Sequence, residues 1–274
     1  MAQPQAMRQT GPLEAIVKRD RLIVAASLLA IAGLSWAYTV NLARGMATGD
    51  GMSMNMGMPM GMANTMSWSP ADFWAQFVMW AVMMFAMMIP SAAPMIMVFA
   101  TVNRRRKSQS DPYVPTFVFL LGYLVLWAAF SVLATTAQWG LHQAALLSSM
   151  MGSTTSAILG GTLLLAAGIF QWTPLKYTCL KHCRSPLGFL MNDWRDGYGG
   201  ALFMGMKHGA FCVACCWVLM ALLFVTGIMN LLWVAVIAGF VLIEKLAPKG
   251  QWVGWAAGLV LVGLAGWTFA GGVI

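Results

Sequence analysis

The fold of this chain is decided by residues 173–220, TPLKYTCLKHCRSPLGFLMNDWRDGYGGALFMGMKHGAFCVACCWVLM, where a polar segment runs into a long apolar one. All five cysteines of the chain and two of its three histidines fall inside this stretch. They form two groups, the first with Cys179, His182 and Cys183, the second with His208, Cys212, Cys215 and Cys216. Thiolate and imidazole are ligand types for soft and borderline metal ions. The stretch therefore predicts a candidate metal site beside the start of a membrane helix.

The spacing within each group is helical. Positions three and four apart lie on the same face of an α-helix, so the ligand-type side chains of each group share an arc of roughly 100°. Thr173 is typical of an N-cap and Pro174 of a first helical residue, while Pro186 closes the segment. We therefore expect a short helix from about residue 174 to 184. The second group would form a ladder along the next helix, towards the middle of the bilayer.

Composition indicates an all-α polytopic membrane protein. Of the 274 residues, 60% are hydrophobic and only 9% are charged, which is more apolar surface than one soluble core of this length buries. A membrane-spanning helix needs about 20 apolar residues. Seven stretches qualify, at about 22–42, 72–102, 116–140, 154–172, 200–226, 229–247 and 252–272. We expect about seven transmembrane helices in a lipid bilayer.

The basic residues predict the orientation of these helices. The chain has 16 Lys and Arg residues. All of them except Arg44 and Lys207 fall at ends of the predicted spans that share one side of the membrane. Basic residues accumulate in cytoplasmic loops, so the N-terminus is expected in the cytoplasm. The net charge of +8 is explained by these rims facing anionic lipid, and we predict no nucleic-acid partner.

These spans divide the chain into four parts. Residues 1–21 are expected to be a cytoplasmic tail, 22–44 a first transmembrane helix that is retained rather than cleaved, and 45–70 an external Met-rich loop. Residues 71–274 would then form a six-helix membrane domain with a cytoplasmic Cys/His segment at 173–199. In the last two spans, Glu244 and Lys245 are expected at a rim, where they would contribute packing and little chemistry.

Methionine is concentrated at two places. The predicted external loop contains GMATGDGMSMNMGMPMGMANTM at 45–66, in which Met54, Met56, Met58 and Met60 alternate with other residues. Thioethers suit Cu(I), so this segment is a candidate copper- or silver-collecting loop, the alternative being a membrane-adherent linker. In the second span, Met79, Met83 and Met87 fall at successive i, i+4 positions on one face. They are candidate ligands as well, or packing residues.

The motifs resemble those of a known family. The segments QWTPLKYTCLKHCRSP at 171–186, GMKHGAFCVACCWVLM at 205–220 and MMFAMMIPSAAPM at 83–95 are similar to a bacterial family of predicted metal-binding integral membrane proteins. That family, classed as a domain of unknown function, includes a membrane copper chaperone associated with a tyrosinase. The resemblance covers about residues 70–272. It implies copper handling for a partner protein, and a location in the bacterial cytoplasmic (inner) membrane.

The residues favour a Cu(I)-binding protein that delivers copper to a copper enzyme or chaperone, or across the membrane, by ligand exchange between Met and Cys/His sites. Zinc is the alternative metal, although it leaves the methionines unexplained. A membrane thiol oxidoreductase using the Cys212–Cys216 motif, or an assembly subunit of a larger complex, is the alternative function. The motif CxxCH does not occur, which disfavours a haem protein. We assign no enzyme activity.

Overall fold

The computed structural model describes residues 12–48, 69–106, 113–147 and 153–272. Within these ranges the protein is helical, with one isolated antiparallel bridge between Leu147 and Thr154, which confirms the all-α prediction. The helices are α1 (Pro12–Thr48), α2 (Pro70–Arg106), α3 (Tyr113–Gln143), α4 (Ala157–Phe170), α5 (Pro174–Arg184), α6 (Pro186–Asp193), α7 (Gly197–Ala221), α8 (Leu223–Thr226), α9 (Leu231–Leu246) and α10 (Gly250–Phe269). Met54, Met56, Met58 and Met60 lie outside the described residues.

Five helical segments are long and apolar enough to cross a membrane, and the bent pair α4 and α5, with 63° between its halves, raises this number to six within the described part of the chain. The expected stretches 154–172 and 229–247 correspond to α4 and α9, which have only 14 and 16 residues. A full crossing takes about 20 residues of helix. The structure therefore supports five or six spans, and the count of seven stays a prediction. α1 begins at Pro12, so it extends into the segment that we predicted as a tail.

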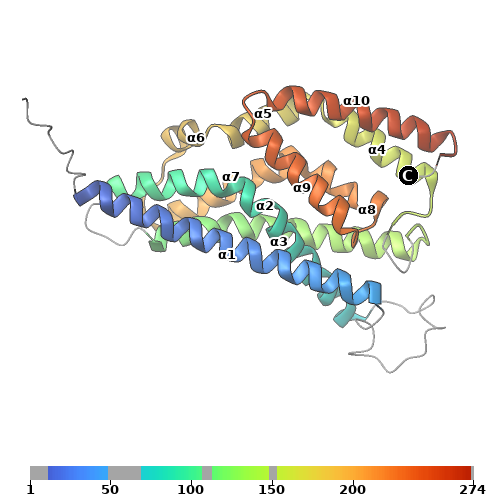
Figure 1. Cartoon of the computed structure of the whole chain (residues 1–274), viewed down its shortest axis with the longest axis horizontal. Helices are drawn as coiled ribbons and strands as arrows, with labels where there is room; N and C mark the ends of the chain where they lie inside the picture. The colour runs from blue at the N-terminus through green and yellow to red at the C-terminus, as the bar shows by residue number, and fades with distance from the viewer. Residues whose placement is uncertain (1–11, 49–68, 107–112, 148–152, 273–274) are drawn as a thin grey trace, which may run out of the picture.

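The long helices α1, α2, α3 and α7 lie side by side, and the shorter helices α4, α5, α9 and α10 cover one side of them (Figure 1). α7 packs against α3 along much of its length and also against α5. α2 contacts α1, α3 and α9. This arrangement places α7, which contains most of the cysteines, in contact with α3 of the long helices and with α5 of the shorter ones.

The close approach of α3 and α7 depends on small residues. A methyl group at Gly205 would collide with the carbonyl oxygen of Phe119, and one at Gly122 would lie 3.0 Å from the backbone nitrogen of Met206. A methyl group at Gly209, one turn after Gly205, would lie 3.0 Å from the side chain of Leu126, which is tighter than an ordinary contact. Small residues let helix backbones approach in this way. Gly205 and Gly209, four residues apart on α7, therefore allow the two helices to pack closely.

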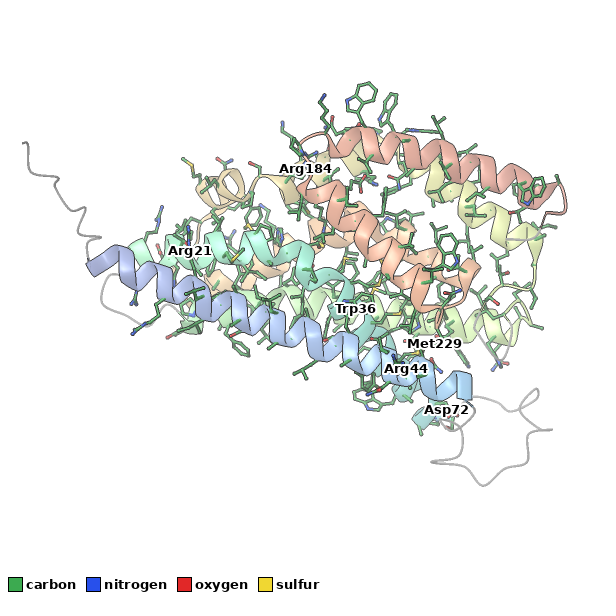
Figure 2. The ribbon with its side chains drawn as sticks, in the orientation of Figure 1. Arg21, Trp36, Arg44, Asp72, Arg184 and Met229 are labelled. Carbon is green, nitrogen blue, oxygen red and sulfur yellow. The ribbon has the colours of Figure 1, made fainter. Side chains whose placement is uncertain are left out.

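Charged side chains lie towards both ends of the helices. Figure 2 shows Arg21 in the left part of the molecule and Arg44 and Asp72 at the lower right, while Arg184 lies near the middle of the upper edge. Arg184 caps the end of α9 by donating to the carbonyl oxygens of Ala247 and Pro248. The cytoplasmic assignment of the N-terminus stays a prediction.

Candidate metal centre

The first Cys/His group lies on a helix with the predicted boundaries. α5 runs from Pro174 to Arg184, and the side chain of its N-cap, Thr173, accepts a hydrogen bond from the backbone N–H of Lys176. Proline at the first position suits the helix because its missing N–H would have had no intrahelical partner. The prediction of a helix from about 174 to 184 is confirmed, and α5 packs directly on α7.

The two groups meet where α5 packs on α7. Cys183 and Cys179 of α5 both lie near Cys215 of α7. On α7, the thiols of Cys215 and Cys216 donate to the carbonyl oxygen of Cys212, at 3.1 and 2.9 Å. All five thiols are free. We call Cys183, Cys212, Cys215 and Cys216 the thiol cluster.

The thiol cluster is enclosed by protein. Cys212 and Cys216 have no exposed surface, Cys215 is 2% exposed, and Cys183 is half-buried. Thiols in such surroundings can bind soft cations without water competing for the metal ion. Among the described residues, however, no three Cys, His, Asp or Glu side chains stand in an arrangement that could hold a metal ion. The donor chemistry fits a soft ion, and binding one would require the side chains to reorient.

A series of ring contacts through Phe211 and Phe189 connects the two histidines. His208 of α7 is almost completely buried, with its ring 5.8 Å from that of Tyr123. Its Nδ1 atom has no hydrogen-bond partner in the described structure. Buried polar atoms are rarely left unpaired, so this nitrogen is a candidate metal-ligating atom. His182 of α5 stacks on Phe211 at 4.3 Å, with Nδ1 2.8 Å from the Thr178 carbonyl oxygen.

A lysine completes the cluster. The Nζ atom of Lys245 on α9 donates to Sγ of Cys212 at 2.9 Å and to Oγ of Ser91 on α2 at 3.1 Å, and its side chain is buried. The sequence predicts a packing role for the part of the chain that contains Lys245, whereas the structure buries its ammonium group against a thiol and a hydroxyl. An ionisable residue within an apolar stretch usually faces the bundle interior, and this signal was present in 229–247. The sequence could not show which helix Lys245 would face.

A buried ion pair lies beside the cluster. Nζ of Lys176 on α5 is 2.7 Å from Oε1 of Glu244 on α9, with both side chains nearly inaccessible. Lys176 also contacts the side-chain oxygen of Gln171 and lies over the ring of Phe240. Lys176 is one of the basic residues that we expected at a solvated rim, and its burial contradicts that expectation. The two residues are far apart in sequence, so their pairing depends on how α5 packs on α9.

The methionines of α2 point into the core. Met79, Met83 and Met87 are 6%, 1% and 1% exposed, so the predicted stripe faces the protein interior. Tyr123 of α3 links this helix to the thiol cluster, because its hydroxyl donates to the Met88 carbonyl oxygen and lies 3.2 Å from Sγ of Cys212. The role of the three methionines as ligands stays a prediction.

Comparison with known proteins assigns this architecture to a family. A family model described as PpoB2, copper chaperone, matches residues 77–268, which is more than half of the chain and includes both Cys/His groups. Among curated proteins and among solved structures, comparison found no match. The resemblance predicted from the cysteine and methionine motifs is confirmed, and the chain belongs to the PpoB2 copper chaperone family.

Proposed function

We propose that this chain binds Cu(I) inside the membrane and passes it to a copper enzyme or chaperone, or across the bilayer. Its family is that of copper chaperones, and copper is therefore its cargo. Thiolates and thioethers favour Cu(I) over harder ions. The proposed ligands are the thiol cluster with Cys179 and the two histidines, the α2 methionines, and the methionines of the external loop.

One observation carries this proposal, namely the meeting of Cys183 with Cys215 at the junction of α5 and α7. Two helices from different parts of the chain bring free thiols together in a buried place. Thiols that served only as small apolar residues would have no reason to converge. The unpaired Nδ1 of His208, on the same helix as three of these thiols, adds a further soft donor.

Transfer by ligand exchange is supported by the position of α2. Lys245 contacts both Ser91 of α2 and Cys212 of α7, so the methionine helix and the cysteine helix share a neighbour. In our proposal, copper moves from the external methionines to Met79, Met83 and Met87 and then to the thiols, or in reverse. Each step replaces one soft ligand by another.

The proposed setting is a multi-pass protein of the bacterial cytoplasmic membrane with a cytoplasmic N-terminus. In this proposal the chain crosses the membrane seven times. Residues 45–70 lie on the external side, and the Cys/His segment 173–199 lies on the cytoplasmic side. The distribution of Lys and Arg along the chain supports it. The partner would approach one rim of the helix bundle, where the copper is released.

The test is the copper content of protein purified without oxygen and loaded with Cu(I), comparing wild type with the triple variant Cys212→Ser, Cys215→Ser, Cys216→Ser. We expect the triple variant to lose tight copper binding while folding normally, because Ser matches Cys in size. A matched control is Ser131→Cys, which adds a buried thiol on α3. Normal copper content in the triple variant would contradict the proposal.

A membrane thiol oxidoreductase is the second candidate, favoured by the closeness of Cys183 and Cys215. Alkylation of the protein as it exists in cells, followed by mass spectrometry, distinguishes the two functions. A redox protein cycles through a Cys183–Cys215 disulfide, whereas a copper carrier keeps both thiols reduced and protects them from alkylation when copper is bound.

A further inference from the structure

The ammonium group of Lys245 lies among thiols rather than carboxylates. Its hydrogen-bond partners are Sγ of Cys212 and Oγ of Ser91. Among the described residues, the carboxylate next to it in sequence, Glu244, forms its ion pair with Lys176 instead. A buried cation is costly unless negative charge lies near it. The residues placed to supply that charge are the cysteines of the thiol cluster.

Copper binding changes the charge of this cluster in a definite way. When Cu(I) replaces the protons of two thiols, two positive charges leave and one enters, so the cluster becomes more negative by one charge. A divalent ion that replaces two protons leaves the charge unchanged. Metal binding to cysteine requires this loss of protons. A fixed positive charge beside the cluster therefore favours a monovalent ion over a divalent one at a two-thiolate site.

We propose that Lys245 is the positioning residue that makes the thiol cluster selective for a monovalent soft ion, by holding one positive charge against Cys212. The inference rests on the proposed function and adds the residue that determines metal selectivity. Lys245 does not bind copper itself. It neutralises the bis-thiolate that copper forms.

The other buried lysine cannot serve this purpose. Lys176 lies 2.7 Å from Glu244, so that pair already sums to zero charge. Lys207 is on the same helix as the thiols, but its Nζ is 2.5 Å from Oδ1 of Asp193 and is about a third exposed. Lys245 is thus the buried cation of the described structure that is positioned to balance thiolates.

Ser91 keeps Lys245 in place while the thiols exchange ligands. Its hydroxyl donates to the carbonyl oxygen of Met88 and accepts from Lys245. When Cys212 turns its sulfur towards copper, the ammonium group retains this second partner on α2. The charge then remains beside the cluster in the copper-bound state, where it is needed.

The experiment compares Lys245→Gln, which keeps an N–H donor without the charge, with Lys245→Arg, which keeps the charge. Cu(I) affinity is measured by competition with a chromophoric Cu(I) chelator in anaerobic detergent solution, and Zn(II) affinity with a zinc chelator. We expect Lys245→Gln to lose about 10–100-fold in Cu(I) affinity, as is usual for residues that support metal ligands, with Zn(II) affinity unchanged or raised. Lys245→Arg should retain most of the Cu(I) affinity. Lys207→Gln, which removes one charge from the same region, should match wild type.

The outcomes separate this inference from the proposed function. If wild type binds Cu(I) and Lys245→Gln binds it equally well, or loses both metals equally, the inference on Lys245 is overturned and the copper function stands. If wild type binds no Cu(I), both fall. Lys245→Met serves where Lys245→Gln does not fold, because it fills the same space without a polar group.

Discussion

The Nζ atom of Lys176 lies 2.7 Å from Oε1 of Glu244, although neither side chain is more than 3% exposed. The pair joins α5, which contains the first Cys/His group, to α9, which contains Lys245. Gly254 of α10 packs against this ion pair, since a methyl group at Gly254 would lie 2.5 Å from Oε1 of Glu244. The pair therefore fixes the position of two helices that line the thiol cluster.

Breaking this pair from one side should destabilise the protein strongly. Lys176→Met leaves a buried carboxylate without its cation, and such changes cost about 3–5 kcal/mol. The double variant Lys176→Met, Glu244→Leu leaves no unpaired charge and should cost much less. Thermal unfolding of the purified protein in detergent measures both. A single variant as stable as wild type would mean that Lys176 and Glu244 are not paired in the folded protein.

The meeting of the two Cys/His groups predicts energetic coupling between them. Cys183→Ser and Cys215→Ser should each weaken Cu(I) binding, and the double variant should lose less than the sum of the two losses. Residues in contact usually show coupling of about 0.5–3 kcal/mol. The measurement is a double-mutant cycle of Cu(I) affinity by chelator competition.

Two separate sites would give the opposite result in that cycle, because distant ligands contribute independently. Additive losses would therefore place Cys183 and Cys215 in different sites. Cys179→Ser, combined with Cys215→Ser in a second cycle, shows whether Cys179 belongs to the same site.

The close packing of α3 on α7 predicts a sharp difference between two glycines. Gly205→Ala places a methyl group against the Phe119 carbonyl oxygen, which is backbone and cannot turn aside, whereas Gly263→Ala on α10 meets nothing within 4 Å. Overpacking typically costs about 1–3 kcal/mol. We expect a lower melting temperature for Gly205→Ala only. Equal melting temperatures would show that the two helices can separate at no cost.

Local structure could be predicted from the sequence because the signals are local. Thr173 and Pro174 marked the start of α5, and the apolar runs marked the long helices. The number of spans was harder, because α4 and α9 are apolar but short. Apolar content alone does not tell a short buried helix from a full crossing.

The cluster could be predicted in its residue types but not in its assembly. Helical spacing gathered Cys212, Cys215 and Cys216 on one face, and the structure adds Cys183 from α5. The place of Lys245 in the cluster could not be predicted, because its hydrogen-bond partners Ser91 and Cys212 come from α2 and α7. Contacts between distant segments depend on helix packing, which no periodicity in a single sequence reports.

The external methionines predict an effect on copper capture alone. Replacing Met54, Met56, Met58 and Met60 by Leu keeps apolar side chains of similar size and removes the thioethers. We expect less copper in the membrane fraction of cells grown at limiting copper, and no change at high copper. Four Leu replacements that leave the dose response unaltered at every copper level would identify the segment as a linker.

Replacing His208 should affect stability and copper binding in opposite directions. Its Nδ1 atom is buried and has no hydrogen-bond partner in the described structure, while its ring packs among Phe119, Tyr123 and Phe189. An unsatisfied buried polar atom costs about 1–3 kcal/mol. His208→Phe keeps an aromatic ring and removes that atom, so the melting temperature should stay the same or rise.

Copper affinity should fall in the same variant if His208 is a ligand as proposed, because the variant lacks the imidazole nitrogen. Such a trade between stability and activity is typical of functional sites. Melting temperature and chelator competition on one preparation measure both effects. A more stable His208→Phe protein with undiminished Cu(I) affinity would make His208 a packing residue, and the thiols would then hold the copper without it.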